Sequence, residues 1–362
     1  MVVISHYQEL NKVQLTIMKL VAMHRTVLLL IGTIIILTTT YIYWSQHNQP
    51  SGLLATAENY VDLVDKRVTV FAVNHFREVH HSIPIPVLNF KQKPECKKVF
   101  DDWLTIALAH DQYQIPPTTI PPKLLAKFLM NGDANLINDY RNERPEVKEH
   151  VWSQIPEWLQ LPENRLVNIS VYHEEGMAMY HALKNYPLND KTGFIIGSQT
   201  PWVEVFALLN GAKEITTLEY QRIKINGTDK VRYMHPIDFA KNWKTYKDGF
   251  DFAISFSSIE HSGLGRYGDP IDPIGDLREV WKTLCVLKKG GLFFLSLNRG
   301  IDAVVFNLHR IYGPKRMSMM MAGFELLATF RDESPVPVPL TSSHFNLGCD
   351  GLKQDLFVLR KL

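Results

Sequence analysis

The residues best suited to chemistry lie in one short segment, residues 255–262, which reads SFSSIEHS. His261 is a candidate general base because an unperturbed imidazole titrates near neutral pH. Glu260 precedes it and could orient the imidazole. Two alternatives stay open: His261 as a loop histidine satisfied by the backbone, and Glu260 as a structural carboxylate below a sheet. We predict His261 and Glu260 as catalytic residues.

A loop rich in glycine and proline follows at residues 263–273 and reads GLGRYGDPIDP. Arg266 in this loop carries a guanidinium group that suits an anionic or hydroxylated ligand. Loops above strand ends often carry binding residues, so we predict Arg266 and Tyr267 as substrate-binding. An architectural turn is the alternative. The acids of the loop are too unspecific to predict a metal site.

The elements that must position these residues are short apolar segments that alternate with helices from residue 166 onward. This alternation predicts an α/β fold with a parallel sheet. The last two apolar segments lack a helix long enough for a parallel crossover, so we expect an antiparallel pair. The predicted strands are residues 193–197, 214–219, 231–235, 250–255, 291–297, 324–330 and 355–360, and the main predicted helices are residues 201–211 and 275–287.

The first predicted strand ends in Gly197, Ser198 and Gln199, and a helix follows directly. Ligands of open α/β sheets bind at the carboxyl ends of the strands, where a helix N-terminus offers free N–H groups. A glycine there lets the backbone approach a ligand closely. The segment lacks the GxGxxG pattern of dinucleotide-binding proteins. We predict these three residues as cofactor-binding.

Three further residues are predicted to bind the same cofactor. Glu219 ends the second strand, where an acid can accept hydrogen bonds from both ribose hydroxyls of a nucleoside. A surface carboxylate that caps the loop is the alternative. Asp238 follows the third strand and could lie near an adenine or serve as an N-cap. Ser255 lies at the end of the fourth strand, at the same edge of the predicted sheet.

Two blocks of sequence resemble a nematode-rich family of uncharacterised proteins with a core like that of class I S-adenosylmethionine (SAM) methyltransferases. They are residues 195–220, IIGSQTPWVEVFALLNGAKEITTLEY, and residues 250–300. Within the second block, residues 287–291 read LKKGG and resemble the L-K-P-G-G turn before the fifth strand of those enzymes, with lysine in place of proline. The resemblance implies a Rossmann-like seven-stranded methyltransferase sheet, SAM as the cofactor, and methyl transfer as the reaction.

An uncharged apolar stretch lies near the N-terminus, at residues 26–44, and reads TVLLLIGTIIILTTTYIYW. Its length is close to the roughly 20 residues that a helix needs to cross a bilayer. A buried helix and a cleaved signal peptide are alternatives, but the stretch is long and ends without a small-residue cleavage signature. We predict a transmembrane helix that anchors the chain in a lipid bilayer.

The charges around this stretch predict its orientation. Lys12, Lys19 and Arg25 precede it, so the positive-inside rule places the N-terminus in the cytosol. This predicts a single-pass type II membrane protein whose body lies in the endoplasmic reticulum or Golgi lumen. The predicted parts are a cytosolic tail (1–25), the transmembrane helix (26–44), a stem (45–55), a helical extension or cap (56–165) and the methyltransferase-like α/β domain (166–362).

Composition excludes some classes of partner. The net charge is +2 and the basic residues are scattered, so nothing points to a nucleic acid. Cys96, Cys285 and Cys349 form no CxxC pair and have no metal-like spacing with histidine, so we predict no metal. Cys285 lies at an apolar position of a predicted helix, where a buried inert thiol is usual. Cys96 and Cys349 could pair only if the fold brings them together.

The sequence as a whole predicts a membrane-anchored SAM-dependent methyltransferase. Its acceptor would be a glycan, a lipid, a secreted protein or a small molecule. The alternative is a catalytically inactive Rossmann-like binding protein tethered to the membrane, which the glycine-poor first loop favours. A metal-dependent glycosyltransferase is disfavoured because the chain has no Asp-x-Asp motif, and a dehydrogenase because it lacks the dinucleotide loop.

Overall fold

The computed structural model describes residues 70–80, 84–110, 114–142, 149–348 and 353–362. All of them belong to one of the two units of the chain, Arg67–Leu362. No helix among these described residues is long and apolar enough to cross a membrane. This finding contradicts the predicted type II membrane protein. The predictions of a membrane helix, a bilayer contact and a lumenal location are therefore not supported. The predicted span at residues 26–44, with its tail and stem, lies outside the described residues.

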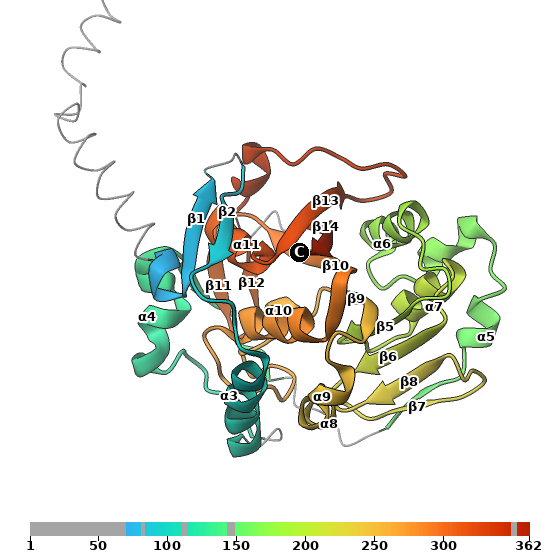
Figure 1. Ribbon diagram of the computed structural model, residues 1–362, viewed down its shortest axis with the longest axis horizontal. Helices are drawn as coiled ribbons and strands as arrows, with labels where there is room; N and C mark the ends of the chain where they lie inside the picture. Colours follow the sequence, from blue (N-terminus) through green and yellow to red (C-terminus); the bar gives the residue numbers. More distant parts are fainter. Residues whose placement is uncertain (1–69, 81–83, 111–113, 143–148, 349–352) are drawn as a thin grey trace, which may run out of the picture. The chain divides into compact units, whose positions relative to one another are not determined.

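The described chain is built around a seven-stranded sheet with the strand order β13-β14-β10-β9-β5-β6-β8 (Figure 1). The pairs from β8 to β10 are parallel, and β14 pairs antiparallel with both β10 and β13. The α/β part of the fold prediction is therefore confirmed, including the antiparallel terminal pair. The strands are β5 (Thr192–Ile196), β6 (Glu214–Leu218), β8 (Val231–Met234), β9 (Phe250–Phe256), β10 (Leu287–Arg299), β13 (Phe324–Phe330) and β14 (Lys353–Lys361).

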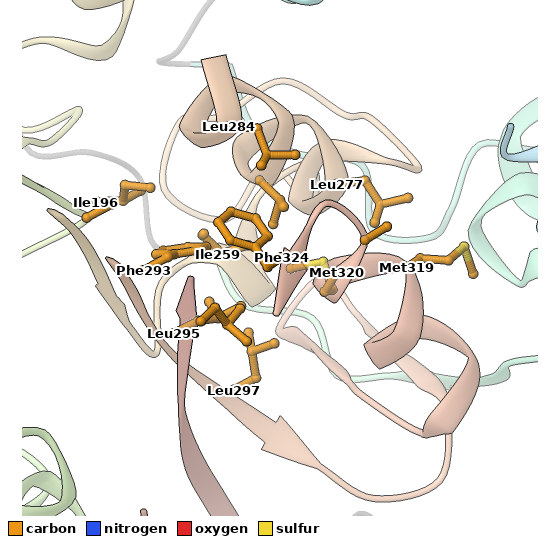
Figure 2. Packing of buried hydrophobic residues seen from close by; sticks show 14 of the residues in the cluster. Ile196, Ile259, Leu277, Leu284, Phe293, Leu295, Leu297, Met319, Met320 and Phe324 are labelled. Atoms are coloured by element: carbon orange, nitrogen blue, oxygen red, sulfur yellow. The ribbon is translucent and has the colours of Figure 1, made fainter. Parts of the chain in front are cut away.

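Both faces of the sheet are buried, which explains why its strands are almost continuously apolar. Successive residues of β9 show this: Phe252 and Ile254 belong to one hydrophobic cluster, and Ala253 belongs to the other. Helices α6 (His173–Asn185) and α7 (Trp202–Leu209) contribute to the first cluster. Helices α3 (Cys96–Ala109), α8 (Pro236–Lys241), α10 (Gly275–Val286) and α11 (Pro314–Met321) contribute to the second, part of which is seen in Figure 2.

The extension predicted to be helical contains α3 but also four strands. Two of them form a hairpin, and the other two pair with strands from the C-terminal half of the chain. These pairings join segments far apart in sequence, so local periodicity does not reveal them. The strands are β1 (Phe76–His80) with β2 (Val87–Phe90), β3 (Asn135–Asn138) in a sheet of order β12-β11-β3 with β11 (Ala303–Phe306) and β12 (His309–Ile311), and β4 (His150–Trp152) with β7 (Ile223–Ile225).

Short helices complete the described chain. They occupy connections between the elements above. The α-helices are α4 (Leu125–Phe128), α5 (Ile155–Trp158) and α9 (Trp243–Tyr246), and the 3-10 helices are η1 (Pro122–Leu124), η2 (Met130–Gly132), η3 (Glu163–Asn168), η4 (Ile259–His261) and η5 (Ser342–Phe345).

The LKKGG segment lies inside β10 and does not form a separate turn before it. Leu287 pairs with Phe250, and the next paired residue, Leu292, lies opposite Phe252. Four residues of β10 therefore bulge out where the partner strand has one. Gly290 has φ +77°, a left-handed conformation that favours glycine. The strand predicted from residue 291 thus begins four residues earlier.

A disulfide joins Cys96 at the start of α3 to Cys285 in the last turn of α10. The prediction of an inert thiol at Cys285 is therefore wrong. Cys285 is buried as expected, with 4% of its surface exposed. It is not a free thiol, because the N-terminal end of α3 packs against it and brings Cys96 within bonding distance. Cys349 lies outside the described residues.

Candidate functional site

A cavity of about 260 Å³ lies at the carboxyl ends of β5, β6 and β9. Strand β5 has β6 on one side and β9 on the other, because the chain runs outward through β6 and β8 before it returns. This reversal of strand order is where open α/β sheets bind ligands. Three of the predicted cofactor-binding residues, Gly197, Ser198 and Gln199, line the cavity, as does Glu219.

Gly197 leaves β5 with φ +69°, a left-handed conformation. A Cβ atom at this position would lie 1.9 Å from Oγ of Ser258, so any side chain would displace the tip of β9. Glycine is required here for both reasons. It brings the ends of β5 and β9 together at one side of the cavity.

The carboxylate of Glu219 ties the tip of β6 to the loop after β5. One oxygen accepts the backbone N–H of Ser198 at 3.0 Å, and the other accepts those of Tyr220 at 2.7 Å and Gln221 at 3.3 Å. Burial raises the pKa of Glu219, and the three N–H groups counteract the shift. Oε1 already accepts two N–H groups, whereas the oxygen bonded to Ser198 accepts one and keeps a further lone pair, so Glu219 can also accept from a ligand through that oxygen.

The loop after β5 is also held from below by Glu204, which sequence reasoning missed. This fully buried side chain accepts hydrogen bonds from the hydroxyls of Ser198 at 3.0 Å and Thr217 at 2.8 Å. Burial raises its pKa to about 7. The available signal was an acid in the first turn of an otherwise apolar helix, α7.

Two predicted cofactor-binding residues lie away from the cavity. Asp238 is exposed in the first turn of α8, and the N-cap of that helix is His235, whose Nδ1 accepts the backbone N–H of Ile237. Ser255 is fully buried within β9. Neither side chain belongs to the cavity wall.

The predicted base His261 lines the cavity as a neutral imidazole. Its Nδ1 donates a hydrogen bond to the carbonyl oxygen of Leu308 at 2.6 Å, because a carbonyl oxygen can only accept. Burial, reinforced by the positive charge of Arg266, lowers the pKa of His261 to about 3. The other ring nitrogen is therefore an unprotonated hydrogen-bond acceptor at neutral pH.

Glu260 is fully buried beside the cavity and reaches it through Ser257. The Ser257 hydroxyl donates to Oε1 of Glu260 at 2.7 Å and lines the cavity wall, whereas Oε2 has no hydrogen-bond partner among the residues that are described. Burial raises the pKa of Glu260 to about 7. Ser257 has φ +47°, a conformation that costs a residue with a Cβ roughly 1–3 kcal/mol. Sequence reasoning missed Ser257, because its strain arises only in the folded chain.

The loop after η4 is organised by Asp269. Its carboxylate accepts the backbone N–H groups of Gly263 at 2.7 Å, Gly265 at 3.0 Å and Tyr267 at 3.2 Å. Tyr267 lines the cavity, and the guanidinium of Arg266 lies 4.7 Å from the centre of its ring. The two predicted substrate-binding residues are thus adjacent, with one of them in the cavity wall.

The sheet and its cavity are typical of one class of α/β fold. The sheet is open and mainly parallel, its cavity lies at the switch point of the strand order, and an acid follows its second strand, an arrangement similar to Rossmann-like nucleoside-binding folds. Residues 190–362 match the family described as Caenorhabditis protein of unknown function, DUF268, which confirms the resemblance to a nematode family seen in the sequence. No curated protein matches the chain.

Solved structures similar to this chain include SAM-dependent methyltransferases. The 1,6-didemethyltoxoflavin-N1-methyltransferase of Burkholderia thailandensis, solved with S-adenosylhomocysteine, is 13% identical, with 53% of this chain and 81% of that chain covered and a TM-score of 0.37. The N-methyltransferase NodS of Bradyrhizobium japonicum, also solved with S-adenosylhomocysteine, is 9% identical, with 58% and 97% covered and a TM-score of 0.34. The [4+2]-cyclase SpnF is 14% identical, with 53% and 84% covered and a TM-score of 0.36.

Proposed function

We propose that this protein binds SAM in the cavity at the ends of β5, β6 and β9 and transfers its methyl group to a small-molecule or glycan acceptor. The observation that carries the proposal is a hydrogen bond in the cavity wall that links the end of β5 to the end of β6. The backbone of Ser198, next to Gly197, is hydrogen-bonded to the Glu219 carboxylate at 3.0 Å. A close backbone approach beside an acid fits the ribose of an adenosyl group.

The residues around the tip of β9 support a proton path for the acceptor. SAM would supply a methyl group on a positively charged sulfur, which an acceptor oxygen or nitrogen attacks. The acceptor proton can pass to Oγ of Ser257 while Ser257 passes its own proton to Glu260, 2.7 Å away. With a pKa of about 7, Glu260 is ionised in part at neutral pH and can hold this proton.

His261 has a different part in this proposal. Its pKa of about 3 makes it a poor store for a proton, since the imidazole remains neutral throughout the physiological range. The fixed tautomer leaves one ring nitrogen free to accept a hydrogen bond. We therefore assign His261 the positioning of the acceptor, with Tyr267 beside it at 5.1 Å between ring centres.

Calorimetry of the full chain with S-adenosylhomocysteine tests the proposal. Wild type should bind, and Glu219→Ala should bind about 10- to 100-fold more weakly, because hydrogen bonds to a charged acceptor are lost. Asp238→Ala is the matched control, since Asp238 is an exposed acid outside the cavity. Unchanged affinity in Glu219→Ala would remove the ribose assignment, and no binding to wild type would refute the proposed function.

A nucleoside-binding protein without turnover is the second candidate. It is favoured by the loop after β5, where residues 197–202 read GSQTPW and hold a single glycine, fewer than a typical methyltransferase loop carries. Formation of S-adenosylhomocysteine from SAM, with pooled hydroxyl- and amine-bearing small molecules and glycans as acceptors, separates the two candidates. Turnover that is lost in Ser257→Ala and kept in Asp238→Ala supports the enzyme.

A further inference from the structure

The side of the cavity formed by α10 carries a buried pair of opposite charges. Glu279, Lys282 and Thr283 line the cavity, and their spacing of three and four residues places them on one face of the helix. Nζ of Lys282 lies 2.7 Å from Oε1 of Glu279. The two side chains are only 6% and 14% exposed.

Helix α3 holds the ammonium group in this position. Nζ of Lys282 lies 3.7 Å from the centre of the Trp103 ring, a cation–π contact. The disulfide of Cys285, one turn beyond Lys282, fixes the two helices to each other. The pair is therefore held rigidly, as a residue pair that recognises a ligand must be.

Stability alone gives little reason for such a pair. Removing two charges from water costs several kcal/mol each, and apolar residues of the same size often replace buried ion pairs at no loss of stability. Apolar and aromatic side chains do line the cavity, among them Phe194, Leu218 and Phe239. A hydrogen-bonding pair among such side chains is the arrangement expected where a flat, mainly apolar ligand has one polar edge.

The adenine base has an edge of this kind. Its 6-amino group donates a hydrogen bond and its N1 accepts one, whereas the carboxylate of Glu279 accepts and the ammonium of Lys282 donates. The residue first predicted near the adenine, Asp238, is exposed on α8 and does not line the cavity. The base must therefore be recognised from another element.

We infer that Glu279 and Lys282 recognise the Watson–Crick edge of the adenine, with Tyr220 and Phe239 in the same wall against the faces of the ring. This inference rests on the proposed function. It makes α10, and not the helix after β8, the element that selects adenine nucleosides.

The test compares two ligands that differ only at this edge. S-inosylhomocysteine carries a carbonyl oxygen in place of the 6-amino group and a protonated N1, which reverses donor and acceptor. In calorimetry with the full chain, wild type should bind S-adenosylhomocysteine at least about tenfold more tightly than the inosine analogue, because a site built for hydrogen bonds rejects a mismatched ligand. Equal affinity for the two ligands in wild type would overturn the inference without any variant.

Two variants assign the preference to the pair. Glu279→Gln should bring the affinity ratio toward one, because an amide can donate to the carbonyl oxygen as well as accept from an amino group. Lys282→Met should weaken binding of S-adenosylhomocysteine and also lower the ratio. Lys288→Met is the matched control. Nζ of Lys288 lies 2.6 Å from a carboxylate oxygen of Asp251, and neither residue lines the cavity, so the variant should leave the ratio unchanged.

The failure of the inference differs from the failure of the proposed function. If wild type prefers S-adenosylhomocysteine but both variants keep the wild-type ratio, the pair is a structural ion pair and the inference is wrong, while SAM binding stands. If wild type binds neither ligand, the proposed function is refuted and the inference with it. Glu219→Ala should weaken both ligands equally and keep the ratio, since both carry the same ribose.

Discussion

At the scale of single residues, the buried carboxyl group of Glu260 makes a prediction about pH. Burial raises its pKa from 4.5 to about 7, so the folded protein binds this proton more tightly than the unfolded chain does. The resulting stabilisation is complete below pH 4.5 and is lost as the pH rises through 7. Glu204 contributes in the same direction, with a pKa also raised to about 7.

Glu260→Gln should reduce this dependence on pH. The amide keeps an acceptor for Ser257 but carries no charge at any pH, so its free energy of unfolding should fall less between pH 5 and pH 8 than that of wild type. The difference should be on the order of 2–3 kcal/mol. Urea unfolding at the two pH values measures it. Glu325→Gln, at an acid that is 45% exposed, is the control, and an equal fall in wild type and Glu260→Gln would contradict the prediction.

Some residues of the site could be predicted from the sequence and others could not, for physical reasons. Gly197 and Glu219 end apolar runs, and strand ends meet at one edge of a parallel sheet, so they could be placed without coordinates. Asp238 also follows a strand, but its direction on the first turn of α8 depends on how that helix packs. Ser257 and Glu204 owe their importance to a strained backbone and to complete burial, which only the folded chain has.

At the scale of elements, the disulfide between α3 and α10 should contribute to stability and to the cavity. It encloses a long segment of chain, with a sequence separation of 189 residues. A cross-link of this kind restricts the unfolded chain and typically stabilises by about 2–4 kcal/mol. Cys96→Ala should therefore lower the free energy of unfolding by about this amount. It should also weaken binding of S-adenosylhomocysteine, because Trp103 of α3 supports Lys282.

Comparison of the single and double variants checks that the bond itself is responsible. Cys96→Ala, Cys285→Ala and the double variant should lose nearly the same stability in urea unfolding, since each removes the same bond. Additive losses would instead show two independent packing effects. Peptide mapping without reductant should recover the two cysteines in one linked fragment from wild type.

The elements themselves differ in how well the sequence predicts them. The strands of the main sheet are apolar on both faces and lie between helices, so their runs stand out locally. The small sheet of β3, β11 and β12 has no such signal, because β3 pairs with a strand far along the chain, with Asn135 opposite Ala303. The bulge in β10 depends on its register with β9, which the LKKGG segment alone does not fix.

At the scale of the whole described molecule, a buried group of charges connects the small sheet to the loop that follows η4. Arg310 on β12 is 2% exposed, and its guanidinium donates to the carbonyl oxygens of Ser262 at 2.5 Å and Asp272 at 3.2 Å. It also lies 3.7 Å from the carboxylate of Asp276, which pairs with Arg316 as well. The two arginines hold the pKa of Asp276 below its usual range despite its burial. The segment that carries His261 is thus held by residues about 50 positions further along the chain.

Replacing Arg310 should therefore loosen the proposed active site as well as destabilise the fold. Arg310→Met leaves the carbonyl groups without their donor and Asp276 with one cation fewer, which should cost about 3–5 kcal/mol. Arg360→Met is the control, because its exposed pair with Glu325 should contribute at most about 1 kcal/mol. Urea unfolding gives the two losses, and hydrogen exchange of the amides at residues 259–264 should quicken only in Arg310→Met. Similar small losses in both variants, with unchanged exchange, would show that the small sheet packs beside the tip of β9 without holding it in place.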